Sequence, residues 1–259
     1  MVKGLYTAWT GMIQQERRMD VLTNNLANAD TNGYKKEGAT AQSFDAMLAF
    51  KIKDASEGYG TAKRLGYNNP GVKIGEGYTD FSQGPVKETS NTFDLALTDK
   101  GFFAIEFQDK SGNTSVKYTR DGNFTLDAEG YLKTQDGDFV LNPDGEHIQI
   151  STLIPDTVIN TSGQIVQDGR VVANIQVTDF EDYNYLKRYG ENYFEPIEGA
   201  TQTESSAQIY SGFLETANIS VASEMVDMIT VQRAYESNQK LITTIDSTLD
   251  IAANQIGKL

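Results

Sequence analysis

VASEMVDMITVQRAYESNQKLITTIDSTLDIAANQI, residues 221–256 of this 259-residue chain, carries the clearest structural pattern in the sequence. Apolar side chains recur in it at alternating spacings of three and four residues, and neither Pro nor Gly interrupts it. The pattern predicts one helix of roughly 35 residues, about 50 Å long, which is too long to be covered by a small domain. The apolar stripe therefore needs another helix or copies of itself as a partner. We assign to this stripe Met228, Val231, Tyr235, Ile242, Ile245, Leu249 and Ile256, with Glu224 and Asn238 as polar exceptions.

The N-terminal segment carries a matching stripe. Its apolar side chains alternate at the same spacings and are interrupted only by Gln15. One such helix alone is usually an ordinary surface helix laid on a core. Stripes at both ends of a chain favour two long helices that pair in the manner of a coiled coil. The N-terminal positions are Leu5, Met12, Met19, Leu22 and Leu26. Together with the C-terminal positions they form the predicted helix seam.

The centre of the chain has the sequence pattern of β-strands joined by tight turns. Turn dipeptides rich in Asp, Asn and Gly follow one another between residues 111 and 145, separated by short aromatic and β-branched segments. Val171 to Phe180 reads as one longer strand, whereas residues 37–81 give no clear prediction. The predicted fold class is α+β with a mainly β core, in which an antiparallel β-rich domain is inserted between two long terminal helices. The predicted segments are 1–36 (helix and turn), 37–81 (connection), 82–200 (β-rich domain) and 201–259 (return segment and helix).

The composition disfavours nucleic-acid binding, nucleophilic catalysis and metal binding. The net charge of −14 disfavours nucleic acid as a partner, and the acidic excess lies in the centre of the chain. There is no Cys and only one histidine, His147, which we interpret as a loop residue. Nucleophilic triads and thiolate metal sites are therefore disfavoured, and the acidic clusters lack the spacing of a calcium loop. We expect no catalytic residue, no cofactor and no metal ion.

The sequence offers no membrane segment. No apolar run approaches the 18 or more residues that a membrane span needs, so we expect the protein not to be membrane-inserted. The N-terminus lacks the continuous apolar stretch and the cleavage site of a signal peptide.

NNLANADTNGYKK, residues 24–36, is unusually rich in asparagine at what reads as a helix end. Asparagine competes with the backbone for hydrogen bonds and suits caps and turns, and Asn-Gly suits a turn with positive φ. We interpret this stretch as a helix exit of defined shape, whose asparagines also suit hydrogen bonds between subunits, and we name its key residues the signature turn. They are Asn24, Asn25, Asn28, Asn32, Gly33 and Tyr34.

The same stretch resembles the N-terminal signature of the flagellar axial proteins, which are the rod, hook and hook-associated subunits. Further stretches are similar to this family in the expected order along nearly the whole chain. They are Ser82-Gln83-Gly84-Pro85, Phe93-Asp94-Leu95-Ala96-Leu97, Gly101-Phe102-Phe103, Tyr118-Thr119-Arg120-Asp121-Gly122-Asn123-Phe124, Ser211-Gly212-Phe213-Leu214-Glu215 through Asn218, Glu224-Met225-Val226 and Gln232-Arg233-Ala234-Tyr235-Glu236.

The resemblance implies a structural subunit of the flagellar basal body, located outside the cytoplasmic membrane. It implies self-assembly into a helical tube that transmits torque and forms part of the export channel, with the terminal helices inside and the β-domain outside. Its partners would be other rod and hook subunits and the type III export apparatus, which would read the uncleaved N-terminus. The length and the connecting segment resemble the distal rod subunit, and a proximal rod or hook-basal-body subunit is the alternative within the family.

Two readings from other classes stay open at this stage. A secreted carbohydrate- or protein-binding β-module explains the acidic hairpins but leaves two long apolar stripes without partners. A glycosidase with paired carboxylates predicts hydrolysis that survives removal of both ends, because such pairs meet only in space.

Overall fold

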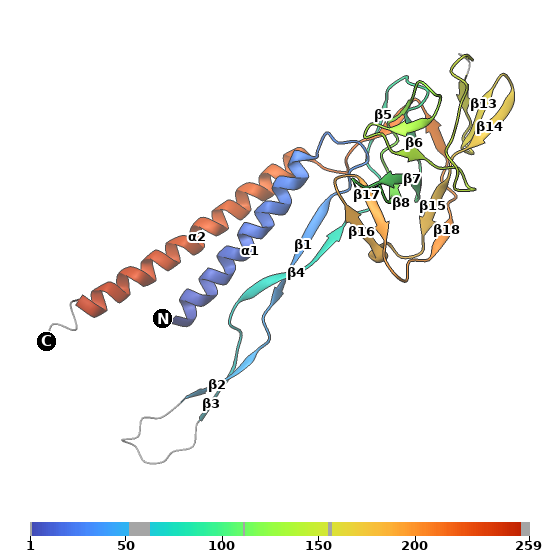
Figure 1. Cartoon of the computed structure of the whole chain (residues 1–259). Helices are drawn as coiled ribbons and strands as arrows, with labels where there is room; N and C mark the ends of the chain where they lie inside the picture. Colours follow the sequence, from blue (N-terminus) through green and yellow to red (C-terminus); the bar gives the residue numbers. More distant parts are fainter. Residues whose placement is uncertain (1, 52–62, 111, 155–156, 255–259) are drawn as a thin grey trace. The chain divides into compact units, whose positions relative to one another are not determined.

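The structure is a computed structural model that describes residues 2–51, 63–110, 112–154 and 157–254. A long helix stands at each end of the chain, and the region between them is mainly β, so the α+β prediction is confirmed at this level (Figure 1). The chain forms two units. The first contains residues 1–26, 37–78 and 221–259, and the second contains residues 27–36 and 79–220. Within the described ranges, no helix is long and apolar enough to cross a membrane.

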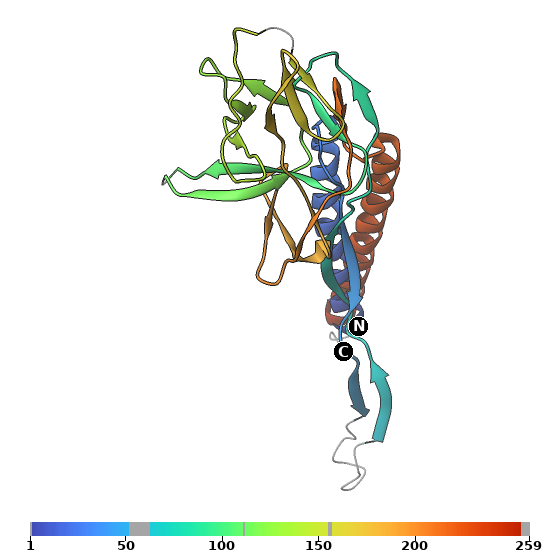
Figure 2. The same cartoon turned by 90° about the vertical axis from the view of Figure 1, so that its right-hand side faces the viewer.

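In the first unit, α1 (Val2–Ala27) and α2 (Val221–Asn254) lie side by side in both ribbon views (Figures 1 and 2). A Cβ atom placed on Gly4 would lie 3.7 Å from Cδ1 of Ile245, and one on Gly11 would lie 3.1 Å from Nδ2 of Asn238. The seven-residue step from Gly4 to Gly11 thus matches a seven-residue step back along α2. The helices are therefore antiparallel, and the glycines allow close approach.

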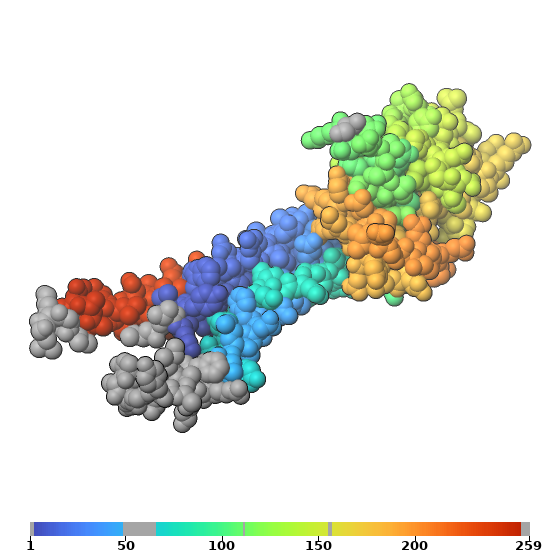
Figure 3. All heavy atoms as spheres, turned by 60° about the horizontal axis from the view of Figure 1, so that its bottom comes forward, coloured from blue at the N-terminus to red at the C-terminus, as the bar shows by residue number. Residues whose placement is uncertain are grey.

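Residues 37–79, which carried no clear prediction, contain the strands β1 to β4. Strand β1 pairs with β4, and β2 pairs with β3. In the space-filling view, the surface of α1 (dark blue) adjoins the light blue and cyan surface of β1 and β4 (Figure 3). Thr10 of α1 is buried, and a side chain on Gly71, whose φ is +148°, would overlap its hydroxyl group. The strands are β1 (Glu37–Ser43), β2 (Met47–Lys51), β3 (Lys63–Asn68) and β4 (Val72–Thr79).

The second unit is built on an antiparallel nine-stranded sheet. Its main path runs β16-β17-β8-β7-β11-β10-β9, while β15 pairs with both β7 and β18. A three-stranded sheet β12-β13-β14 and the pairs β19-β6 and β20-β5 complete the unit. The elements are β5 (Val86–Glu88), β6 (Leu95–Leu97), β7 (Phe102–Gln108), β8 (Thr114–Thr119), β9 (Phe124–Leu126), β10 (Leu132–Thr134), β11 (Phe139–Val140), β12 (Thr157–Ile159), β13 (Gln164–Gln167), β14 (Arg170–Asn174), β15 (Val177–Phe180), the 3-10 turn η2 (Tyr183–Tyr185), β16 (Leu186–Tyr189), β17 (Tyr193–Pro196), β18 (Gln202–Glu204), β19 (Ile209–Ser211) and β20 (Phe213–Glu215).

Strand β7 places side chains into two hydrophobic clusters. Successive side chains of a strand point to opposite faces of the sheet. Phe103 and Ile105 accordingly join a large cluster with Leu132, and Phe102 and Ala104 join a smaller one. All four β7 residues are fully buried. The central strand therefore carries an uninterrupted apolar run because both of its faces are covered.

The predicted turns close hairpins. The backbone N–H of Gly130 donates to Asp127 O at 2.9 Å, and that of Gly137 donates to Thr134 O at 3.1 Å. The prediction of one strand over residues 171–180 is wrong, because β14 and β15 belong to different sheets. Between them, the N–H of Ile175 donates to Gly163 O and the N–H of Gln176 donates to Leu141 O, which ends one ladder before the next begins.

The two turns provide a matched test of the hairpin geometry. Gly130 (φ +84°) and Gly137 (φ +97°) both have positive φ, but a Cβ atom at Gly130 would overlap the carbonyl oxygen of Ile150, whereas open space surrounds Gly137. We expect Gly137→Ala to lower the free energy of unfolding by about 1–3 kcal/mol through backbone strain alone. Gly130→Ala should cost several kcal/mol more. Urea unfolding measures both, and equal losses would show that the overlap is relieved without cost.

Candidate functional site: the helix seam and the signature turn

The least exposed side chains of α2 follow the spacing of the predicted seam. Val231 is buried, and Met228, Tyr235, Ile242 and Ile245 are partly buried. Exposure rises toward the C-terminus, from 2% at Val231 to 40% at Leu249. Ile256 lies outside the described residues. This face of α2 is therefore covered within the first unit over most of its length, and its part in assembly stays a prediction.

The α1 seam positions are covered as well. Leu22 is buried, and the others, Leu5, Met12, Met19 and Leu26, are partly buried. A second set of α1 side chains, which includes the buried Thr10 and Gln14, lies on a different face of the helix. The N-terminal helix therefore has two covered faces, of which the sequence stripe indicated one.

A polar contact is buried inside the seam. Asn25 and Glu224 are both fully buried, and Nδ2 of Asn25 donates to Oε2 of Glu224 at 3.3 Å. The Asn25 side chain also makes two bonds to the main chain of Glu37, donating to its O at 2.8 Å and accepting from its N–H at 3.0 Å. A buried side-chain amide with these fixed partners tolerates one register of the two helices, because a slip would leave polar groups unpaired.

The signature turn divides between the two units. Asn24 is exposed on α1, and Asn25 belongs to the first unit. Asn28, Asn32, Gly33 and Tyr34 belong to the second unit. There, the N–H of Thr31 donates to Asn28 O at 3.2 Å, and the N–H of Tyr34 donates to Thr31 O at 3.4 Å. The positive φ that the sequence implied is present at Gly33, at +67°.

Gly33 and Tyr34 are buried in the second unit. The N–H of Gly33 donates to the main-chain O of Glu215 at 2.8 Å. A Cβ atom at Gly33 would overlap the amide nitrogen of Asp121 and the carbonyl carbon of Arg120. The Tyr34 ring is 1% exposed, with the Arg188 guanidinium 4.2 Å from its centroid. Tyr34 is thus buried, and its ring is held partly by a cation over its face.

Sequence reasoning missed a buried charge cluster next to this turn, the Glu215 cluster of Lys35, Arg120 and Glu215. Lys35 Nζ lies 2.6 Å from Glu215 Oε1, and Arg120 Nη1 lies 3.3 Å from Oε2. The N–H of Gly84 also donates to Oε1 at 2.8 Å, and Lys35 Nζ donates to Ser82 O at 2.8 Å. Burial lowers the pKa of the Lys35 ammonium below its ordinary value, while the Glu215 carboxylate opposes the shift. In the sequence, these three residues stood out only because each lies in a different one of the stretches that resemble the flagellar axial proteins.

Asp121, next to Arg120, is the acidic group most affected by burial near the turn. Burial raises the pKa of its carboxyl to about 6, although hydrogen bonds from Asn123 and Asn192 oppose the shift. The N–H of Asn123 donates to Oδ1 at 3.0 Å, and Nδ2 of Asn192 donates to Oδ2 at 3.2 Å. The Asp121 carboxyl therefore has a structural role next to the turn, where it accepts hydrogen bonds from a main-chain N–H and a side-chain amide.

The lone histidine is exposed and lies outside the named strands, as the sequence suggested, but its ring makes two contacts. His147 stacks on Phe139 with ring centroids 4.1 Å apart, and its Nε2 lies 2.8 Å from Glu106 Oε2. Its side chain is 34% exposed. Among the residues that the structure describes, no group of three or more His, Cys, Asp or Glu side chains is placed to hold a metal ion.

Comparison with known proteins gives three family matches along the chain. Residues 5–35 match the family described as "Flagella basal body rod protein", residues 96–173 match "Flagellar hook protein FlgE/F/G D1 domain", and residues 210–256 match "Flagellar basal body rod FlgEFG protein C-terminal". The chain is also 34% identical to the flagellar basal-body rod protein FlgG of Buchnera aphidicola, over 96% of this chain and 98% of the relative.

The chain belongs to the flagellar basal-body rod protein family. It is therefore a structural protein of the basal-body rod. Other relatives are the flagellar hook-basal body complex protein FlhO of Bacillus subtilis, 31% identical, and the flagellar basal-body rod protein FlgF of Caulobacter vibrioides, 30% identical. Both alignments cover 100% of this chain and 100% of the relative.

Each family match contributes one member of the Glu215 cluster to this rod protein. Lys35 lies in the N-terminal match, Arg120 in the D1 match and Glu215 in the C-terminal match. The cluster therefore joins three parts of the chain that are far apart in sequence.

Replacing Gly33 tests the signature turn of this rod-family chain. We expect Gly33→Val to lower the free energy of unfolding of the second unit by about 3 kcal/mol or more, because a β-branched residue is strained at φ +67° and its Cβ overlaps main chain. Ala39→Val, in strand β1, should change it by less than about 1 kcal/mol. Urea unfolding of both purified variants measures the difference. Equal stability would mean that the turn adapts to a side chain.

Asp121 predicts a pH dependence with a defined sign. Since its pKa is raised to about 6 from the ordinary 3.8, the folded state holds the proton more tightly. This contribution to stability is complete below pH 3.8 and is lost as the pH rises through 6. We expect Asp121→Asn to remove up to about 3 kcal/mol of the fall in unfolding free energy across this range. Urea unfolding at several pH values tests this, with the exposed turn variant Asp144→Asn as control. An unchanged slope in Asp121→Asn would contradict the assignment.

Proposed function

We propose that the chain is a subunit of the distal flagellar rod that polymerises into a helical tube. The tube transmits torque, and its lumen forms part of the export channel. The identity to FlgG over nearly the whole chain supports the distal assignment, whereas the full-length matches to FlgF and FlhO support a proximal rod or hook-basal-body subunit as the second candidate. The proposed role is structural rather than enzymatic.

One observation carries the proposed polymerisation. Seven large apolar side chains of α2 remain exposed in the isolated chain, each at 40% or more, although α2 is already packed along one face. Exposed apolar surface of this extent on one element is typical of a protein–protein contact. The residues are Val221, Met225, Val226, Ile229, Leu241, Leu249 and Ile251.

The arrangement of the two helices supports a coiled-coil-like seam as part of the proposal. The three contact points Gly4–Ile245, Gly11–Asn238 and Asn25–Glu224 all fit one antiparallel register with steps of seven or fourteen residues. Together the seam and the signature turn are the proposed assembly residues. We retain residues 1–36, 37–81, 82–200 and 201–259 as proposed functional segments.

The remaining partners and the location follow from the same proposal. The subunit would contact other rod and hook subunits, and the flagellar type III apparatus would export it through its uncleaved N-terminus to the basal body outside the cytoplasmic membrane. Electron microscopy of the concentrated purified chain tests the polymerisation. Short tubes or rods are expected, and a chain that stays monomeric at all concentrations would contradict the proposal.

Ile242→Asp tests the seam directly. Ile242 is partly buried in the first unit, and a lone carboxylate in an apolar seam costs several kcal/mol. We expect the variant to form no rods while the second unit keeps its melting transition, because Ile242 is not part of that unit. Lys240→Asp, at an exposed position of the same helix, is the control and should still assemble. Stable rods from Ile242→Asp would show that the seam is not needed for assembly.

A further inference from the structure

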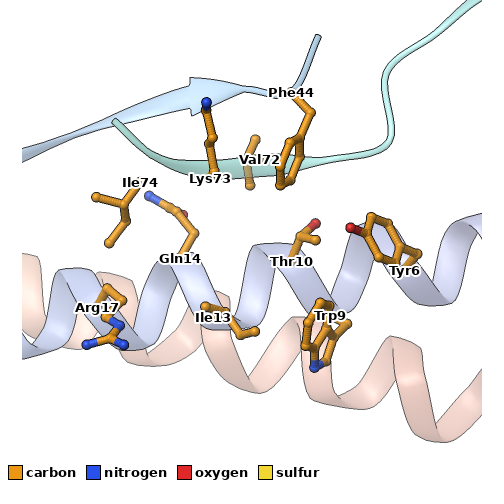
Figure 4. Close-up of a pocket in the computed structure, with 10 residues that line it drawn as sticks. All are labelled: Tyr6, Trp9, Thr10, Ile13, Gln14, Arg17, Phe44, Val72, Lys73 and Ile74. Atoms are coloured by element: carbon orange, nitrogen blue, oxygen red, sulfur yellow. The ribbon is translucent and has the colours of Figure 1, made fainter. Parts of the chain in front are cut away.

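A groove in the first unit runs between α1 and strand β4 (Figure 4). It has a volume of about 410 Å³. Phe44 and Ile74 point from the strand side toward α1, and Trp9 and Ile13 stand on the helix (Figure 4). Tyr6 and Trp9 are 44% and 47% exposed, with their rings 5.8 Å apart. The groove is therefore an open apolar surface with two aromatic side chains left uncovered.

The first turns of α2 carry a convex counterpart, which we name the α2 ridge. It consists of Ala222, Met225, Val226 and Ile229, which are spaced at i, i+3, i+4 and i+7 and share one face of the helix. Met225, Val226 and Ile229 are 51%, 63% and 49% exposed, whereas Glu224 and Val231 on the opposite face are buried. A ridge of this spacing is the form in which an amphipathic helix enters a hydrophobic groove.

We propose that the α2 ridge of one copy of this chain docks in the α1–β4 groove of the next copy. This inference rests on the proposed polymerisation and specifies one contact within it. The two surfaces differ and lie on the same chain, so their contact is heterologous. A heterologous contact that does not close on itself generates an open helical polymer, which is the assembly proposed above.

The symmetry of a helical polymer fixes the orientation of this contact. Rotation about an axis and translation along it leave the direction of every helix along that axis unchanged. Since α1 and α2 are antiparallel within a copy, α1 of one copy and α2 of its neighbour are antiparallel too when both run along the axis.

Charge then selects the register. In the antiparallel register with Val226 opposite Ile13, Ile229 lies opposite Thr10, and Glu236 lies opposite Lys3, because ten residues separate the outer members on each helix. Lys3 and Glu236 are both exposed. The register also brings Arg233 opposite Tyr6, where a guanidinium can lie over the exposed ring. Val226 thus meets the apolar Ile13 within the groove, and opposite charges meet at its end.

The reversed orientation predicts a different ion pair. If the helices were parallel with Met225 opposite Tyr6, Glu236 would meet Arg17, since eleven residues separate the members of each pair. The cation that pairs with Glu236 therefore distinguishes the two arrangements.

Cysteine cross-linking tests the contact, since the chain has no cysteine of its own. Ile13→Cys and Val226→Cys chains are purified separately, mixed, assembled and oxidised. We expect a covalent dimer that forms only in the mixture and only under polymerising conditions. Ile13→Cys mixed with Ile251→Cys, another exposed position on α2, is the matched control. Rods of the mixture that give no dimer, or that cross-link no better than the control, would overturn the inference and leave the proposed polymerisation standing. A mixture that never polymerises would overturn both.

Charge reversal tests the register. Lys3→Glu and Glu236→Lys should each raise the concentration needed for polymerisation by about 2- to 5-fold, and the double variant should restore it. Arg18→Glu, outside the groove, is the control for the same change of charge. Circular dichroism of each variant confirms that its helices are formed. Restoration by Arg17→Glu with Glu236→Arg instead would overturn the antiparallel register, and no restoration in either pair would overturn the ion pair.

Discussion

The buried carboxylate of Glu215 is the interaction on which the second unit depends. It receives the Lys35 ammonium on one oxygen and the Arg120 guanidinium on the other, and its main-chain oxygen accepts from Gly33. Isolated charges at this depth would be strongly unfavourable, and each is acceptable only because the others are in place. The cluster therefore joins three segments that are distant in sequence. The signature turn, the hairpin around Arg120 and the final β-strand must all be correctly placed before any of them is stable.

The first unit also contains a buried polar contact, between Asn25 and Glu224, with fewer charged groups. Apolar stripes bring α1 and α2 together but tolerate sliding, since one apolar contact resembles the next. The buried bond between Asn25 and Glu224, together with the two bonds of Asn25 to the main chain of Glu37, has no equivalent in a shifted register. In both units, hydrophobic burial holds the segments together, and a small number of buried polar groups selects one packing arrangement over the others.

Periodic features were predictable from the sequence, and long-range pairings were not. The stripe from Met228 to Leu249 and the Gly-containing turns were recognisable because helix and hairpin patterns are local. Val171–Phe180 was predicted as one strand because its β-branched residues carry no sign that Ile175 and Gln176 bond to two distant segments. Residues 37–79 gave no clear prediction because most of their strands are rich in polar residues and Gly.

In the candidate site, too, local features were predictable and long-range contacts were not. Asn28, Gly33 and Tyr34 were identified from turn chemistry and from a family resemblance, whereas the pairing of Lys35 with Glu215 was not predicted. Their burial depends on pairing across 180 residues, which no local pattern reports. The α1–β4 groove was also unpredictable, because three of its ten lining residues come from β4, a strand that the sequence did not reveal.

The uneven coverage of α2 has a mechanical consequence. The helix pair is in contact from Glu224 to Ile245, which faces Gly4, and the apolar stripe of α2 becomes exposed only after that point, reaching 40% at Leu249. A helix end without a partner offers little bending stiffness. In the proposed polymer the rigidity at that level would come from neighbouring copies packed against this end of α2. The elastic modulus of the shaft would then be a property of its subunit boundaries, and a load too large for it would separate subunits before it deformed the β-sheet.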